Sequence, residues 1–272
     1  MELSIYGSTG FIGSKFIKMY PFHNRIKREE RKPLNKDILY LISNVGNYNL
    51  DIDASIDIKT NLSILCEVLN YCKNEEIIFN FISSSLVYGS LCPIPANENS
   101  ICTPKGFYSI TKKCAEDLLI SFSKTFGIKY RILRLCSVLG KGEKKVSNRK
   151  NTLTQIVNKL KTNENIELHG ERGQIREIIH IEDACRAIEL ICKKGRLNQI
   201  YNVGSGEIIK IESFISNAKE KLQSKSKIIY VDTPKSKTEE LKTNFWMDSK
   251  KLNDLGFKNH FNYKDIINDI CN

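Results

Sequence analysis

Tyr108 and Lys112 lie four residues apart in the segment YSITK, a spacing that could pair a proton donor with the charge that activates it. If the segment is helical, both side chains project from one face of the helix. An ammonium beside a phenol favours the phenolate, so we expect Lys112 to lower the pKa of Tyr108 from about 10 toward neutrality. The same spacing also arises by chance between two surface residues, so other features of the sequence are needed to distinguish the two interpretations.

Ser84 is a further candidate, at the end of the apolar run IIFNFISS (77–84). Such a run is typical of a buried strand. A hydroxyl at the end of that strand can hydrogen-bond a substrate oxygen beside the tyrosine. Ser84, Tyr108 and Lys112 together form the candidate catalytic set.

A glycine-rich turn near the N-terminus is a candidate site for a phosphate-containing cofactor. The segment GSTGFIG falls between a strand-like run (2–7) and an apolar pattern at helical spacing (11–20). Glycines there let the backbone approach a pyrophosphate, and the helix N-terminus supplies N–H donors. A tight turn without a ligand is the alternative. The candidate cofactor-binding residues are Gly7, Gly10, Phe11, Ile12 and Gly13.

Strands and helices alternate through the first half of the chain. Further strands are expected at 38–43 and 130–135, a helix around Leu62 to Leu69, and another helix from Tyr108 onward. Alternation of this kind produces right-handed βαβ units. We therefore predict an α/β fold, a Rossmann-like doubly wound parallel sheet with helices on both faces.

The composition of the sequence changes after Gly140, where a charged and polar segment begins. We predict a dinucleotide-binding Rossmann domain over 1–140, with 178–204 returning to it. A small substrate-binding lobe would be built from 141–177 and 205–272.

The composition argues against several kinds of partner. The 272 residues include 42 lysines and arginines and 31 aspartates and glutamates, a net charge of +11. These basic residues are spread along the chain without a recognisable nucleic-acid module, so we expect an anionic small molecule and no nucleic acid. The nine cysteines form no C-x-x-C pair and the four histidines share no ligand spacing, which predicts reduced thiols and no metal site.

The expected location is the cytoplasm, with no membrane partner. No apolar stretch approaches the length of a membrane span. The chain begins directly with the strand-like LSIYG rather than with a basic and then apolar leader.

Seven segments occur in the order and spacing of one protein family. They are GSTGFIG, SSSLVYG (83–89), YSITK, RLCSVLG (134–140), REIIHIEDACRAI (176–188), YNVGSGE (201–207) and DSKKLNDLGF (248–257). Together they resemble the extended short-chain dehydrogenase/reductases, the NAD-dependent epimerase/dehydratase family, that act on nucleotide-diphosphate sugars. The resemblance covers essentially the whole chain, and the first glycine spacing of three also points to short-chain reductases.

The resemblance implies a role for each matching residue. Ser84, four residues before Tyr88, would be catalytic with Tyr108, and Lys112 would also hold the nicotinamide ribose. Arg176 would bind the sugar-nucleotide diphosphate, a task that suits a guanidinium, with a surface salt bridge as the alternative.

Other positions also follow from the resemblance. Ser85 and Ser137 are candidate substrate-binding residues, although many relatives carry an asparagine in place of Ser137. Asn61 falls where the family has an asparagine that supports the helix of the tyrosine; the alternative is a helix cap. A basic loop could line the phosphate site or be solvated, and it contains Lys141, Lys144, Lys145, Arg149 and Lys150.

The region before the strand at 38–43 departs from the family. Fewer than 20 residues stand where relatives fit a strand, a helix and a further strand, so the adenine side of the sheet is expected to be shortened. The basic residues there favour the 2′-phosphate of NADP over NAD, with Arg28 as the candidate ligand; a solvated hairpin is the alternative. They are Arg25, Lys27, Arg28 and Arg31.

The reaction we predict is the NAD(P)H-dependent reduction of the 4-keto group of a nucleotide-diphosphate (6-deoxy)sugar, in the biosynthesis of surface polysaccharide sugars. Dehydratases of the family carry an acidic pair where this chain has Ser85 and Leu86, so a 4,6-dehydratase is not expected. A 4-epimerase with retained NAD and a non-catalytic dinucleotide-binding regulator are the alternatives.

A homodimer is the assembly that the resemblance suggests. It would form through a four-helix bundle that includes the helix at 108–126. The residues expected on the exposed face of this helix, unless they belong to the core, are Ile110, Leu118, Leu119 and Phe122.

Overall fold

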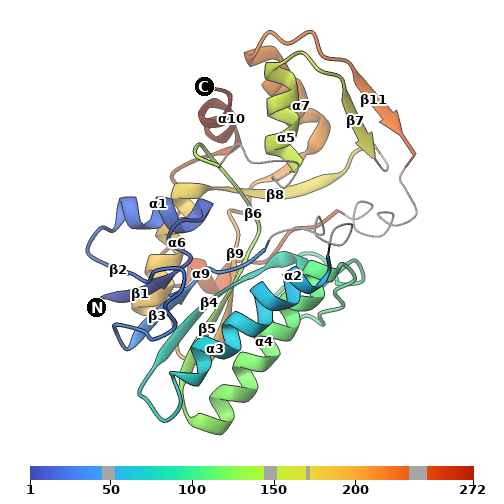
Figure 1. The fold of residues 1–272 in the computed structure, drawn as a ribbon. Helices are drawn as coiled ribbons and strands as arrows, with labels where there is room; N and C mark the ends of the chain where they lie inside the picture. The colour runs from blue at the N-terminus through green and yellow to red at the C-terminus, as the bar shows by residue number, and fades with distance from the viewer. Residues whose placement is uncertain (45–52, 144–151, 170–171, 233–243) are drawn as a thin grey trace.

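A parallel six-stranded sheet lies at the centre of the computed structural model (Figure 1). The structure describes residues 1–44, 53–143, 152–169, 172–232 and 244–272. Across the sheet, the strands are β2 (Asn24–Arg25), β1 (Leu3–Tyr6), β3 (Asp37–Tyr40), β4 (Ile78–Ser84), β5 (Lys129–Leu135) and β9 (Gln199–Val203). All neighbouring strands are parallel, which confirms the predicted α/β, Rossmann-like fold.

Helices cover both faces of this sheet, as a doubly wound fold requires (Figure 1). Leu3 and Ile5 of β1 point into the core that packs against α1 (Phe11–Met19) and α6 (Ile181–Lys194). Tyr6, on the opposite side of the same strand, belongs to the core shared with the second pair of helices. These helices are α3 (Ile64–Asn70), preceded by α2 (Ser55–Ile58) and the π-helical turn η1 (Lys59–Ser63), and α4 (Phe107–Phe126).

The edge of the sheet at β2 is short, as the sequence predicted. Strand β2 has two residues, and the segment that follows it is fastened to β1. Ser4 Oγ accepts hydrogen bonds from the backbone N–H groups of Leu34 (2.9 Å) and Asn35 (2.7 Å), and the Tyr6 hydroxyl donates to the Arg31 carbonyl oxygen (2.7 Å). A fixed loop therefore takes the place of a longer strand at this edge.

The C-terminal half contains two smaller sheets with their own hydrophobic core (Figure 1). The strands are β10 (Ile208–Lys210), β8 (Ile175–His180) and β6 (Ser137–Leu139) in one sheet, and β11 (Ile228–Val231) and β7 (Ile166–His169) in the other. The helices are α5 (Thr152–Lys161), α7 (Ile211–Lys221), α9 (Lys250–Asn253) and α10 (Tyr263–Cys271). The division into domains at the predicted boundaries stays a prediction.

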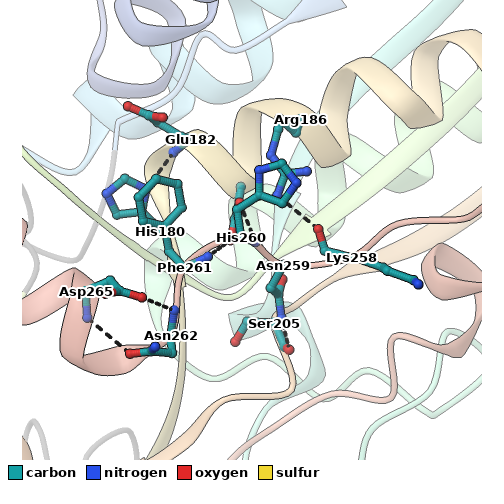
Figure 2. A network of polar contacts seen from close by, with 11 residues as sticks. His180, Glu182, Arg186, Ser205, Lys258, Asn259, His260, Phe261, Asn262 and Asp265 are labelled. Carbon is teal, nitrogen blue, oxygen red and sulfur yellow. Dashed lines mark hydrogen bonds and ion pairs between the residues drawn. The ribbon is translucent and has the colours of Figure 1, made fainter.

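A polar network joins the C-terminal segment to α6 (Figure 2). His180 caps the helix, because its Nδ1 accepts from the backbone N–H of Glu182 at 3.3 Å, and its ring stacks on Phe261 with 3.9 Å between centroids. The carboxylate of Asp183 accepts from the backbone N–H groups of His260 and Phe261, each at 3.0 Å. These contacts tie the segment that leads into α10 to the start of α6.

Within the ranges that the structure describes, none of the helices combines the length and the apolar character that crossing a bilayer requires.

Gly13→Ala should destabilise the protein by about 2 kcal/mol or more, because a Cβ at this position would overlap the Gly7 carbonyl oxygen in the turn. Gly127→Ala is the matched control. Gly127 has a φ of +75° and open space around it, so its replacement should cost only the conformational penalty of about 1 kcal/mol. Urea unfolding of the two variants measures the difference, and equal losses would contradict the close approach of helix and turn.

Candidate active site

The glycine turn lies at the carboxyl end of β1. Gly7 has a φ of +78°, and a Cβ there would lie 2.9 Å from the Leu41 carbonyl carbon. Gly10 is the N-cap residue of α1, and its N–H donates to the Gly7 carbonyl oxygen at 3.0 Å. The strand order reverses between β1 and β3, and open α/β sheets bind ligands at this reversal. The turn thus has the glycine-lined backbone and helix N-terminus that fit a dinucleotide pyrophosphate.

Ser84 and Tyr108 are brought together by the structure. Ser84 is the last residue of β4, and Tyr108 lies in the first turn of α4, with 7% of its surface exposed. The Tyr108 side chain forms hydrogen bonds with the side chains of Ser84 and Ser43. Ser84 Oγ also accepts from the backbone N–H of Leu86 at 3.2 Å. Three segments that are distant in sequence therefore meet at the phenol.

The pKa of Tyr108 is raised, so the lowering expected from the sequence was wrong. Burial, which disfavours the phenolate, is the largest cause of the rise. The hydrogen bonds with Ser84 and Ser43 act in the opposite direction, and the charge of Asp57 raises the pKa further. The phenol therefore holds its proton at neutral pH.

The Lys112 ammonium points to the strand below it. Its Nζ donates to the Ile82 carbonyl oxygen at 2.6 Å and lies 4.2 Å from the centroid of the Phe81 ring. The residue is 2% exposed. Burial lowers the pKa of Lys112 to about 7, and the charge of Glu116 opposes this lowering.

Asn61 is buried in η1 and supports the helix of Tyr108. Its Oδ1 accepts from Ser43 Oγ (3.1 Å) and from the Asn44 backbone N–H (2.9 Å). Its Nδ2 donates to Thr111 Oγ1 (3.0 Å), which donates in turn to the Tyr108 carbonyl oxygen (2.9 Å). These contacts favour the supporting role over the helix cap.

Ser43 and Thr111 were missed by the sequence reasoning. Ser84 was selected because it is a hydroxyl residue at the carboxyl end of a buried strand. Ser43 follows the carboxyl end of the buried strand β3, so the same criterion would have selected it. Thr111 lies inside YSITK, three residues after Tyr108, where it reaches the carbonyl of the preceding turn.

The remaining substrate-side candidates lie elsewhere in the fold. Ser85 begins the short helical turn η2 (Ser85–Tyr88), directly after Ser84, and is half-buried. Ser137 and Arg176 lie in the three-stranded sheet, on β6 and β8. The Arg176 guanidinium donates to its neighbours' oxygens, the Ile175 carbonyl (2.9 Å) and Gln174 Oε1 (3.1 Å), and burial lowers its pKa. Their binding of substrate stays a prediction.

The basic residues at the β2 edge of the sheet differ in their surroundings. Arg31 donates to Glu67 Oε2 at 2.6 Å and to the Arg28 carbonyl oxygen at 2.7 Å, so it anchors the loop. Arg28 itself is exposed, as are Arg25 and Lys27.

The predicted basic loop is described only at its start. Lys141 is exposed, and its backbone N–H donates to Asp269 Oδ2 at 2.7 Å. Lys144, Lys145, Arg149 and Lys150 lie outside the described residues. In the part of the chain that is described, no group of three or more histidine, cysteine or acidic side chains could hold a metal ion.

Lys112→Met should remove a pH-dependent contribution to stability. The folded-state pKa of Lys112 is about 7, below the ordinary 10.5, so burying its charge costs stability below about pH 7, and the cost fades as pH rises. The wild-type free energy of unfolding should thus rise between about pH 7 and about pH 10. Urea unfolding at several pH values checks this.

Lys113→Met is the control for this series, because Lys113 is on the same helix but pairs with Asp117 near the surface. The Lys113→Met variant should keep the wild-type rise in the free energy of unfolding with pH. If Lys112→Met follows the wild-type curve throughout, the lowered pKa of Lys112 is wrong.

Comparison with known proteins identifies the family. A sequence model of the NAD dependent epimerase/dehydratase family matches residues 31–204. The low-salt glycan biosynthesis protein Agl12 of Haloferax volcanii is 23% identical over 244 residues, which cover 76% of this chain and 77% of the relative. A putative UDP-glucose 4-epimerase of Methanocaldococcus jannaschii is 26% identical over 225 residues, 81% of this chain and 69% of the relative.

Solved structures share the fold over nearly the whole length. The UDP-glucose 4-epimerase of Thermotoga maritima with UDP-glucose has a TM-score of 0.87 at 18% identity, covering 99% of this chain and 97% of that one. RMD of Pseudomonas aeruginosa complexed with NADPH has a TM-score of 0.84 at 20% identity, with the same coverage. Because the family match spans β3 to β9, from the strand beside the glycine turn through the helix of Tyr108, the chain belongs to the NAD dependent epimerase/dehydratase family.

Proposed function

We propose that the protein reduces the 4-keto group of a nucleotide-diphosphate (6-deoxy)sugar with NADPH. The observation that carries this proposal is the hydrogen-bonded pair of Ser84 and Tyr108 at the carboxyl edge of the sheet, beside the glycine turn. The raised pKa of Tyr108 keeps its phenol protonated at neutral pH, which is the state that a proton donor needs.

Each residue of the pair has a defined part in this reaction. The Tyr108 hydroxyl donates its proton to the ketone oxygen as the carbonyl carbon is reduced. The Ser84 hydroxyl hydrogen-bonds the same oxygen and orients it toward Tyr108. When bound, the reduced nicotinamide supplies the hydride.

The coenzyme would be held by the N-terminal half of the site. The glycine turn would bind the pyrophosphate through backbone N–H groups, and Lys112 would hold the nicotinamide ribose. Arg28 would bind the 2′-phosphate of NADP from the loop after β2, with Arg31 fixing the loop's backbone. The residues lining the turn are Gly7, Gly10, Phe11, Ile12 and Gly13.

The substrate would occupy the space beyond the ends of β4 and β6. Arg176, Ser137 and Ser85 are the proposed ligands of the sugar nucleotide. A dTDP-4-dehydro-6-deoxyglucose reductase of Escherichia coli is among the relatives, which supports this choice of reaction. Dehydration is less suited to the site, because Ser85 and Leu86 have no carboxylate to exchange protons at the sugar.

A 4-epimerase with retained NAD is the second candidate, and the names of the relatives favour it. Ser84 and Tyr108 would serve this reaction equally well. An epimerase regenerates its cofactor in each turnover, whereas a reductase must exchange it. The short, basic adenine side is the reason to prefer an exchanging coenzyme.

The assembly, location and pathway are also proposals. A homodimer would form through the exposed face of α4, where Ile110 (46% exposed) and Leu118 (36%) flank a shallow hollow. Leu119, which the sequence placed on this face, is instead a core residue with no exposed surface. A cytoplasmic enzyme of surface polysaccharide biosynthesis is consistent with the glycan biosynthesis protein among the relatives.

Tyr108→Phe should keep the fold and lose about 10²- to 10⁴-fold in turnover, because it removes the donated proton and little else. The assay uses purified protein, nucleotide-linked 4-keto-6-deoxy sugars and NADPH, and follows the loss of reduced nicotinamide absorbance. Tyr71→Phe, at an exposed tyrosine of the same protein, is the control and should be fully active. An unchanged rate in Tyr108→Phe would refute the assignment of the proton donor.

The wild-type assay also separates the candidate reactions. Stoichiometric consumption of the reduced coenzyme identifies a reductase. Without such consumption, conversion of an unmodified hexose nucleotide to its C4 epimer by protein carrying its own NAD identifies the epimerase. A nicotinamide cofactor that binds without any turnover in a broad panel would indicate the regulator.

Arg28→Ala should weaken NADPH binding by about tenfold or more and leave NADH binding unchanged, because only NADPH has the 2′-phosphate. Titration of each coenzyme by fluorescence measures the two dissociation constants. Lys36→Ala is the control, because it removes an exposed basic residue that pairs with Glu76, and it should alter neither dissociation constant. Equal effects of Arg28→Ala on both coenzymes would contradict the assigned phosphate contact.

A further inference from the structure

Helix α4 is joined to strand β4 by two buried polar contacts directly before Ser84. Lys112 Nζ donates to the Ile82 carbonyl oxygen at 2.6 Å, and Ser83 Oγ donates to Glu116 Oε1 at 2.5 Å. Lys112 and Glu116 are one helical turn apart on the same face, and Ile82 and Ser83 are consecutive in the strand. The two contacts therefore fix α4 against the strand that ends at the candidate site.

Glu116 is held from the neighbouring strand by Arg134. The guanidinium donates to both carboxylate oxygens, from Nε to Oε1 at 3.0 Å and from Nη2 to Oε2 at 2.7 Å. Ser83 and Arg134 are register partners in β4 and β5, so their side chains share the sheet face that α4 covers. Glu116 has no exposed surface, Arg134 has 2% and Ser83 has 3%. The carboxylate is thus fixed on two sides in a place where an unpaired charge would be costly.

We propose that Glu116 is a positioning residue whose carboxylate, fixed by Arg134 and Ser83, fixes the place of Lys112 against β4 and favours its charged form. The inference rests on the proposed function, in which Lys112 holds the nicotinamide ribose. Burial works against this charge, and it lowers the pKa of Lys112 to about 7. The charge of Glu116 acts in the opposite direction. The negative side chain one turn along the helix therefore increases the protonated fraction of Lys112 near neutral pH.

Several other ionisable groups lie on the elements packed around Lys112. They are Tyr108 on α4, Asp57 on α2, Cys66 and Glu67 on α3, Tyr88 on η2 and Arg134 on β5. Among the residues that the structure describes, Glu116 is the one whose charge raises the pKa of Lys112. Arg134 forms hydrogen bonds with Glu116 and with Tyr88, and these interactions raise the pKa of Arg134 against the effect of burial.

The test is the pH dependence of unfolding in Glu116→Gln, which removes the charge and keeps the size of the side chain. Without the carboxylate, the pKa of Lys112 should fall further, so the rise of the free energy of unfolding with pH should begin about one pH unit lower than in the wild type. A residue that only filled space would change stability equally at every pH. An unchanged onset in folded Glu116→Gln overturns the proposal.

Two more variants make the comparison secure. Asp183→Asn removes another fully buried carboxylate that pairs with an arginine, on α6 at the opposite face of the sheet, and its onset should match the wild type. Glu116→Gln leaves the Arg134 charge unpaired and can fail to fold, so Glu116→Gln/Arg134→Met removes both charges. In the double variant, the free energy of unfolding should also begin to rise at a lower pH than in the wild type. A rise that begins at the wild-type pH would overturn the proposal.

Unfolding requires no substrate, which separates this inference from the proposed function. If the wild type reduces no 4-keto sugar nucleotide, the proposed function fails while the onset comparison still tests Glu116. If the wild type reduces a 4-keto sugar nucleotide, the alkaline limb of the kcat/KM profile in Glu116→Gln should move to lower pH. The pH at which the free energy of unfolding begins to rise should move with it. A loss of kcat/KM that is equal at every pH would contradict the action of Glu116 on Lys112.

Discussion

The burial of three ionisable side chains on one face of α4 is the constraint on which the candidate site depends. Tyr108, Lys112 and Glu116 follow at intervals of four residues, and they are 7%, 2% and 0% exposed. Charged groups at this depth need partners, so β4 provides a carbonyl and a hydroxyl and β5 provides Arg134. Satisfying these groups also fixes where α4 lies, and thereby places the phenol beside Ser84.

The same burial shifts two pKa values in opposite directions. It raises that of Tyr108, because the charged form is the phenolate, and it lowers that of Lys112 to about 7, because the charged form is the ammonium. A single low-dielectric environment therefore keeps the phenol protonated and makes the pKa of the amine sensitive to the charge of Glu116. Pairs of groups with divergent pKa values are typical of sites that transfer protons.

The topology of the parallel sheet gathers the remaining groups at one edge. The glycine turn follows β1, Ser43 follows β3 and Ser84 ends β4, and these carboxyl ends are neighbours where the strand order reverses. At the outer edge, hydrogen bonds to Ser4 replace a longer strand with a fixed loop. Arg28 is exposed in this loop.

The sequence by itself determined the order of strands and helices and the glycine turn, and it marked Ser84, Tyr108 and Lys112 as candidates, because alternation and short spacings are local properties of the chain. Only the tertiary structure decided the direction of the Tyr108 pKa shift and the involvement of Ser43 and Glu116. The i and i+4 spacing predicted a shared helix face, but not that the ammonium would turn to a carbonyl of β4. Burial and hydrogen bonding between residues such as Ser83 and Glu116, 33 positions apart, arise when the helix packs on the sheet, and no local pattern encodes them.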